Sequence, residues 1–169
     1  MTVAIQQLIW QIERTRDGFH RAVYDDADLD AAMAALADDC TVLNLPVGTG
    51  AGGGDAVRRH LAEEVLPHRP DDLTFRRVSR TVDKFRLVEE TVVAFTHDRE
   101  LPWLLPGVAP THRRAEVLAI SVVTVRHRTR QNVVASLITA QRTLWDHAGL
   151  LAQLGLEPAD VMVEGRVTV

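Results

Sequence analysis

The chain has 169 residues, the length of one globular domain, and its 46% hydrophobic and 25% charged content is ordinary for a soluble protein. A net charge of −4 without interleaved basic and aromatic residues argues against nucleic acid as a partner. The single cysteine, Cys40, excludes an intrachain disulfide and a cysteine-based zinc site. We find no signal-peptide pattern and no apolar run of about 18 residues, so we expect one cytoplasmic domain over residues 1–169 without membrane contact.

The first third of the chain is predicted to be mainly helical, because apolar residues recur every three or four positions. Aspartates stand where helix N-caps are expected, and Pro67 stands where the last of these helices ends. In chain order we predict a helix over Val3–Tyr24, a helix over Leu29–Leu36 capped by Asp28, a strand over Thr41–Leu45 and a helix capped by Asp55.

After Pro70 the hydrophobic period changes to that of strands. Polar turns are predicted at Asp83-Lys84 and at Arg128–Asn132, and a proline-rich loop over Arg99–Ala115. We predict strands over Leu73–Val82, Phe85–His97, Glu116–Arg126 and Val133–Trp145, and then a short helix over Ala148–Leu156. Helices followed by a meander of long antiparallel strands indicate an α+β fold with helices on one face of a sheet.

The stretch LNLPVGTGAGGGDAV contains the spacing G-x-G-x-x-G at Gly48, Gly50 and Gly53. A dinucleotide-binding loop needs a parallel strand before it, a helix after it and further strand–helix units. One such unit is present, but no later helix alternates with the strands and no lysine completes a phosphate loop. We therefore predict a tight turn in which glycine tolerates positive φ, and no nucleotide cofactor.

Asp146, at the end of the last predicted strand, is the first candidate for chemistry. Alternation places it on one strand face with Arg142 and Leu144, while Thr143 and Trp145 share the other. If the first face lines the interior, a carboxylate among apolar walls becomes a usable general acid or base. The alternative is that Asp146 only caps the N-terminus of the following helix.

The predicted elements follow one another as helix, Asp-capped helix, strand, helix and a meander that ends in W-D-x-x-G-L-L-x-Q-L-G, and this order spans roughly Ile5–Leu156. Three segments stand out within it: Ala37–Val42, Gly54–His60 and Trp145–Gly155. These segments and their order resemble the SnoaL-like polyketide cyclase branch of the nuclear transport factor 2-like superfamily.

This resemblance implies a cone-shaped α+β barrel, in which N-terminal helices pack on a curved, mostly antiparallel sheet around a deep pocket. It further implies a homodimer formed through the sheet, no cofactor, no metal, and an acid/base aspartate for ring closure at Asp146. The chain departs from the family at Ala140 and Arg142, where E-x-W is frequent, and at Ser121, where a histidine is frequent. These departures indicate a more cationic pocket on the same scaffold.

Further side chains are candidates for the pocket wall. His97 shares a strand face with Phe95 and is either a catalytic group or a satisfied core histidine. Trp103 lies in the proline-rich loop, which either covers the cavity or forms a dimer interface. An inward Arg142 requires an anion, either from the chain or from the substrate. We expect substrate contacts from Asn44, Trp103, Arg142 and Ser121.

Three functions remain open. The first is cofactor-independent cyclase, isomerase or lyase chemistry on an apolar carbonyl substrate, with Asp146 as acid/base and His97 or Asn44 assisting. The second is epoxide hydrolysis by water that Asp146 and Arg142 activate. The third is a non-catalytic module that binds a small apolar or anionic ligand. The other histidines show no metal-ligand spacing, and His20 is predicted to lie off the apolar face of its helix.

Overall fold

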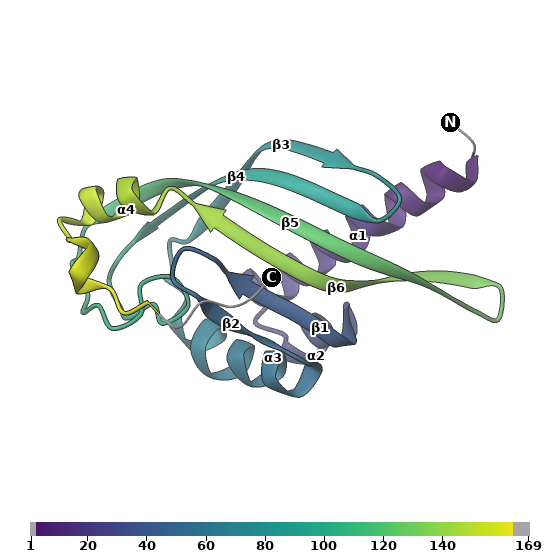
Figure 1. The fold of residues 1–169 in the computed structure, drawn as a ribbon, viewed down its shortest axis with the longest axis horizontal. Coiled ribbons are helices and arrows are strands. Elements are labelled where there is room, and N and C mark those ends of the chain that lie inside the picture. The colour runs from purple at the N-terminus through teal and green to yellow at the C-terminus, as the bar shows by residue number, and fades with distance from the viewer. Residues whose placement is uncertain (1–2, 164–169) are drawn as a thin grey trace.

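The computed structural model describes residues 3–163, which form a six-stranded sheet with helices against it (Figure 1). The helices are α1 (Val3–Tyr24), α2 (Leu29–Ala34), α3 (Gly54–His60) and α4 (His147–Leu154). A π turn over Leu61–Val65 and a 3-10 turn over Leu66–His68 follow α3, and another 3-10 turn covers Pro158–Asp160. The strands are β1 (Leu36–Asn44), β2 (Thr49–Gly52), β3 (Thr74–Val82), β4 (Arg86–Thr96), β5 (Arg114–Arg130) and β6 (Val133–Trp145).

The strand order is β2-β1-β6-β5-β4-β3. The β1–β6 pair is parallel, and the other neighbouring pairs are antiparallel. The predicted α+β class and the mostly antiparallel sheet are therefore confirmed. Because β2 and β3 lie at opposite edges and do not pair with each other, the sheet stays open and does not close into the expected barrel.

The long helix α1 has the predicted bounds and lies across one face of the sheet, in contact with β3, β4 and β6 (Figure 1). Its stripe of Ile12, Phe19 and Val23 is buried, as the helical period predicts. The hydroxyl of Thr15 donates to the carbonyl oxygen of Ser136 at 3.1 Å and ties the helix to β6. The space between α1 and the sheet is thus the interior of the molecule.

Of the two predicted N-caps, Asp28 and Asp55, the structure confirms the first and not the second. Asp28 caps α2 as predicted, since its side chain accepts from the backbone N–H of Ala31 at 2.9 Å. Asp55 lies inside the first turn of α3, and the cap position belongs to Gly53. β1 begins at Leu36, earlier than predicted.

The glycine motif forms the β1–β2 hairpin and the start of α3. Gly48, Gly50 and Gly53 all have positive φ, as the predicted tight turn requires. At Gly50, where φ is +123°, a Cβ atom would lie 2.0 Å from the carbonyl oxygen of Val42 on the paired strand. The glycines therefore serve close backbone approach in an antiparallel hairpin.

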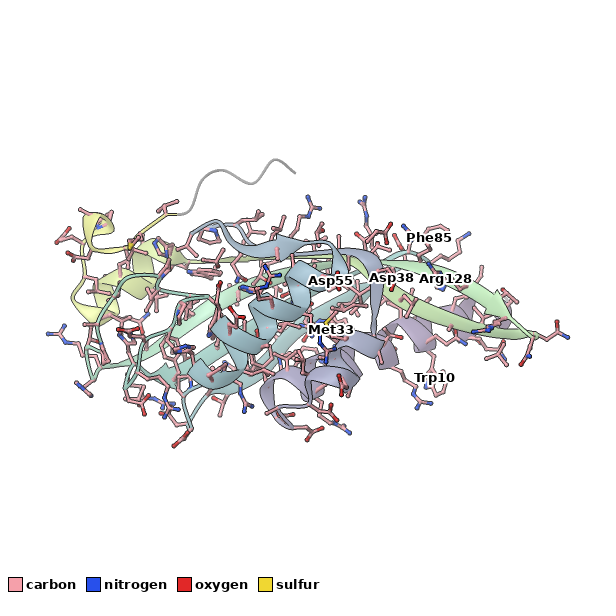
Figure 2. All side chains as sticks on the ribbon, turned by 90° about the horizontal axis from the view of Figure 1, so that it is seen from below. Trp10, Met33, Asp38, Asp55, Phe85 and Arg128 are labelled. Carbon is pink, nitrogen blue, oxygen red and sulfur yellow. The ribbon has the colours of Figure 1, made fainter. Side chains whose placement is uncertain are left out.

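The β5–β6 hairpin extends beyond the rest of the sheet at the end where α1 begins (Figure 1). Its turn uses Gln131 and Asn132, both with positive φ. Figure 2 shows Phe85 and Arg128 at this end of the molecule, with Trp10 on α1. The hairpin is remote from α4, which lies at the opposite end of the same strands.

Candidate functional site

A small cavity lies between α1 and the sheet, and it offers about 50 Å³ to the centres of water-sized molecules. Because one water needs about 10–15 Å³ on this measure, the cavity has room for more than one water. The wall is mostly apolar, with a few polar groups that converge on the space. The lining residues from α1 are Arg16, His20 and Tyr24; those from the strands and the proline-rich loop are Asn44, Phe75, Thr91, Val93, Trp103, Leu104, Val117, Ala119, Ser121, Gln141, Thr143 and Trp145.

The polar side chains of α1 stand four residues apart, so they share one face of the helix. His20 packs edge-on against the ring of Phe75, with centroids 4.4 Å apart, and lies 4.8 Å from the ring of Tyr24. Arg16, deeper along the helix, is only 5% exposed. One helix face therefore supplies a guanidinium, an imidazole and a phenol to the cavity.

Burial sets the protonation states of this helix face. Desolvation, with a further contribution from the Arg16 charge, lowers the pKa of His20 to about 3, so its imidazole is neutral at pH 7. Burial raises the pKa of Tyr24, so its hydroxyl stays protonated and can donate a hydrogen bond. Burial also lowers the pKa of Arg16, but an arginine keeps its charge in proteins. No aspartate or glutamate is among the described residues that line the cavity.

Asn44, at the end of β1, lines the cavity as expected. Its Nδ2 donates to the carbonyl oxygen of Trp103 and to the hydroxyl of Thr49, each at 3.1 Å. A backbone carbonyl only accepts, so the amide nitrogen must face it. The Oδ1 atom of Asn44 is thereby left to accept a hydrogen bond from elsewhere.

The proline-rich loop covers the cavity. Trp103 and Leu104 line it, and both side chains are buried, together with Leu101 and Leu105. The hydroxyl of Thr49 donates to the carbonyl oxygen of Trp103 at 2.7 Å and holds the loop against β2. Of the two interpretations left open for this loop, the structure supports the cover, because its apolar side chains face inward.

Ser121 also lines the cavity, on β5, where its hydroxyl oxygen lies 3.4 Å from that of Thr143 on β6. Asn44, Ser121 and Trp103 therefore line the same cavity, and their contact with a substrate stays a prediction.

Several polar atoms on the cavity-lining side chains are buried without a hydrogen-bond partner among the residues described. They are Nε of Arg16, Nε1 of Trp103 and Oε1 of Gln141. Buried polar groups in folded proteins are normally satisfied, so a cluster of unsatisfied ones requires an explanation. The three residues all line the cavity.

Asp146 does not face this cavity. Its side chain is exposed, caps α4 and accepts from the backbone N–H of Gly149 at 2.9 Å. The expectation that it lines the pocket is therefore wrong, and the alternative reading as an N-cap is confirmed. The physical reason is that α4 begins at the residue after Asp146, so the carboxylate is used by the helix terminus.

Arg142 lies on the same outward face of β6 as Leu144. The inward face carries Gln141, Thr143 and Trp145, which line the cavity. Upstream, Ser136 and Ile138 are the buried positions, and an irregular register beside Thr139 switches the inward face from even to odd numbers. The expected anion-binding role of Arg142 in the pocket is thus not supported by its position.

His97 is fully buried but is not among the residues that line the cavity. Its Nδ1 accepts from the backbone N–H of Thr111 at 3.3 Å and lies 3.1 Å from the hydroxyl of the same residue. Burial, together with the charge of His112, lowers the pKa of His97. This geometry makes it a core histidine that fastens the proline-rich loop.

The sequence interpretation missed the three side chains of α1. His20 was predicted to lie off the apolar face, yet it contacts Phe75 and Tyr24 across the cavity. The signal for Arg16 is present in the sequence, because it stands four residues after Ile12 and three before Phe19, within the buried stripe. A charged residue inside an apolar stripe is the kind of exception that marks a site.

Among residues 3–163, no three His, Cys, Asp or Glu side chains gather in an arrangement for a metal ion. Over the same residues, no helix combines the length and apolarity needed to cross a bilayer.

No family model matches the sequence, and no curated protein matches it. Solved structures do match. A candidate SnoaL-like polyketide cyclase of Jannaschia sp. CCS1 is 14% identical, with a TM-score of 0.66 over 94% of this chain and 98% of that one. A protein of Catenulispora acidiphila with a ketosteroid isomerase-like fold, in complex with trimethylamine, is 14% identical, with a TM-score of 0.57 over 85% and 93%. An LEH-like epoxide hydrolase of M. tuberculosis is 16% identical, with a TM-score of 0.56 over 89% and 91%.

At these identities the likeness concerns the fold, and the fold does not fix the reaction. With the element order and the cavity under α1, it shows that the chain has the α+β fold that these SnoaL-like and ketosteroid isomerase-like proteins share.

Proposed function

We propose that the protein is a cofactor-independent enzyme that binds a small, largely apolar carbonyl compound in the cavity and moves a proton at the carbon beside the carbonyl. The observation that carries this proposal is the polar face of α1, where His20 and Tyr24 enter an apolar cavity and make no side-chain hydrogen bond to the described residues. Proteins that share the fold include candidate polyketide cyclases and ketosteroid isomerase-like proteins, which supports this reaction class.

In the proposed reaction, the hydroxyl of Tyr24 donates to the substrate carbonyl oxygen. A ring nitrogen of His20 takes the α-proton, and the C–H electron pair moves into the enolate, whose oxygen Tyr24 stabilises. Return of the proton to another carbon gives an isomerisation. Attack of the enolate carbon on a second carbonyl gives ring closure, and the imidazolium then protonates the new alkoxide.

This assignment replaces Asp146 as the acid/base. The carboxylate of Asp146 caps α4 outside the cavity, whereas His20 and Tyr24 line it. For the same reason we do not favour epoxide hydrolysis, because neither Asp146 nor Arg142 is among the lining residues that would activate water.

The proposal is tested with phenylacetone, a small aromatic ketone whose α-protons exchange in D₂O and are followed by NMR. We expect the wild-type protein to accelerate exchange over protein-free buffer. Because general-base catalysis contributes about 10²–10⁴-fold, His20→Gln should remove most of the acceleration. Tyr24→Phe should reduce it at least tenfold, and Asp146→Asn should leave it unchanged. Loss of exchange in Asp146→Asn, with normal exchange in His20→Gln, would restore the aspartate mechanism.

A second function, a binding module without catalysis, is favoured by one observation. A histidine whose pKa lies near 3 is a weak base in the free protein. Phenylacetone that binds to the protein, as seen by NMR line broadening, but exchanges no faster than in buffer would support the binding module over the enzyme.

We also propose that the protein is a homodimer formed through the outer face of the sheet. Apolar side chains on the strands of this face, on the side opposite α1, are 38–52% exposed: Val78, Val88, Leu118, Ile120 and Leu144. Ile120 and Leu144 are register partners on adjacent strands, and so are Val88 and Val122. A second copy of the chain offers the same apolar surface and covers it by symmetry.

A further inference from the structure

Arg16 is a buried cation for which the fold supplies no direct partner. Within residues 3–163, no carboxylate oxygen lies within 4.0 Å of its guanidinium, and its Nε is buried without a hydrogen-bond partner. Arg80, its neighbour in the same region, shows the contrast. The guanidinium of Arg80 holds Glu89 and Asp17, each at 2.6 Å.

The nearby carboxylate of Glu89 is already occupied. Its Oε2 accepts from Nε and NH2 of Arg80 at 3.1 and 2.6 Å, and its Oε1 faces the hydroxyl of Thr91 at 3.4 Å. Glu89 attracts the Arg16 charge only across a longer distance, and burial of the guanidinium outweighs that attraction. A buried charge without a partner is unfavourable, so retaining one on a cavity wall calls for a ligand.

The polar side chains that line the cavity beside Arg16 carry no charge. His20 is neutral at pH 7, the hydroxyl of Tyr24 is protonated, and the amide of Gln141 is uncharged. The remaining wall is apolar and includes Phe75 and Val93. Arg16 is therefore the one charged side chain among the described residues that line this cavity, while Asp17, Arg80 and Glu89 line the adjoining hollow.

We propose that the ligand carries a carboxylate, which pairs with the guanidinium of Arg16 inside the cavity, on an apolar body that fills the rest of the space. This inference rests on the proposed function, since it names the class of molecule that enters the same cavity. A guanidinium and a carboxylate match each other as a bidentate pair, which gives orientation as well as affinity.

The pairing has a consequence for catalysis. The Arg16 charge helps to keep His20 neutral, while Asp17 acts in the opposite direction and Arg80 in the same direction. A bound carboxylate offsets the Arg16 charge and makes His20 a stronger base. A substrate with a carboxylate would thus strengthen the group that removes its own proton, so a neutral ketone such as phenylacetone is expected to exchange more slowly than a keto acid of similar shape.

The test uses three molecules of the same shape: phenylacetate, phenylacetamide and phenylacetone. Their dissociation constants are measured by isothermal titration at pH 7 with wild type, Arg16→Met, Arg16→Lys and Arg142→Met. We expect wild type to bind phenylacetate at least tenfold more tightly than the amide. Arg16→Met should abolish that preference and leave the affinity for the two neutral ligands unchanged. Arg16→Lys should retain part of the preference for phenylacetate. Arg142→Met, which removes an arginine outside the cavity, should behave as wild type.

A second readout is the titration of His20 by NMR, in which phenylacetate should raise the protonation constant of the ring at least tenfold and phenylacetamide should not. Binding of the two neutral ligands without a preference for phenylacetate would overturn the carboxylate inference and leave the proposed function standing. Equal binding of phenylacetate to wild type and Arg16→Met would overturn it as well. Failure of all three molecules to bind would count against the proposed function itself.

Discussion

The side-chain amide of Asn44 and the backbone carbonyl of Trp103, which are 59 residues apart in the sequence, are joined by a hydrogen bond of 3.1 Å. The bond connects the end of β1 to the loop that covers the cavity, and Thr49 donates to the same carbonyl oxygen. Two side chains of the β1–β2 hairpin thus bind one carbonyl of the distant loop and hold that loop over the cavity.

The first prediction concerns this contact with the loop. Thr49→Val keeps the shape of a fully buried side chain but removes the donor to the Trp103 carbonyl. Loss of a buried hydrogen bond costs about 1–3 kcal/mol, and we expect that loss in the free energy of unfolding, measured in urea. We also expect faster ligand dissociation, because the cover opens more readily. Thr129→Val, on the β5–β6 hairpin, is the control, and equal losses in both variants would contradict the assignment.

The second prediction is the pH dependence of stability. The pKa of His20 is about 3 in the folded protein, against about 6.5 when unfolded. The unfolded chain therefore binds the proton first, so this contribution to stability is present above pH 6.5 and is lost as the pH falls towards 3. Between pH 6.5 and 4.5 it amounts to about 2 kcal/mol. Over this pH interval the free energy of unfolding, measured in urea, should therefore fall by about 2 kcal/mol less in His20→Gln than in wild type.

The control for this experiment is His68→Asn, which removes a histidine that is not among the charges acting on His20 or on His97. A pH slope of His20→Gln equal to that of wild type would show that another group carries the acid sensitivity. His97 and His147, whose pKa values burial also lowers, are the next to examine.

The third prediction compares two buried arginines. Arg16→Met removes a charge without a close partner, so we expect the free energy of unfolding to rise, by about 1–3 kcal/mol. Arg80→Met leaves the buried carboxylate of Glu89 without its partner, so it should lower the free energy of unfolding by about 3 kcal/mol. Urea unfolding of both variants decides whether Arg16 serves the fold or the ligand. A loss in Arg16→Met as large as in Arg80→Met would make it structural.

The fourth prediction concerns the glycine motif. Gly50→Ala places a methyl group 2.0 Å from the Val42 carbonyl oxygen in a backbone with φ of +123°, so we expect it to unfold the hairpin or cost at least about 3 kcal/mol. At Gly53 nothing lies within 4 Å of an added Cβ, and Gly53→Ala should cost about 1 kcal/mol, from its positive φ alone. Thermal unfolding measures both. Similar costs would mean that close approach is not the reason for Gly50.

The sequence predicts the helices better than the site, for physical reasons. α1 follows from a strong 3.6-residue period, and the cap at Asp28 from the chemistry of helix ends. β2 was missed because its residues, Thr49–Gly52, include two glycines and offer no alternating apolar pattern.

The pocket face of β6 was misassigned because both of its faces carry large apolar side chains. Leu144 points outward and Trp145 inward, so alternation alone leaves the choice open. The register irregularity beside Thr139, which no sequence signal marks, then decides which residues line the cavity. Arg16 was overlooked because a charged residue on a helix is ordinarily solvent-exposed, and only the position of the sheet shows that this one is not.

The last prediction concerns the outer face of the sheet. If two copies meet there, wild-type protein should have the mass of a dimer in light scattering after size exclusion, and Ile120→Glu should shift it to the monomer. Glutamate would place two like charges near the symmetry axis of a dry interface, where they cannot be solvated. Val133→Glu is the matched control, because Val133 is 66% exposed at the tip of the β5–β6 hairpin, away from this patch. A wild-type monomer at micromolar concentration, or dissociation by Val133→Glu in place of Ile120→Glu, would contradict the proposed interface. The substitution leaves the cavity residues on the opposite face in place, so a monomer that still binds phenylacetone would also show that each chain holds a complete site.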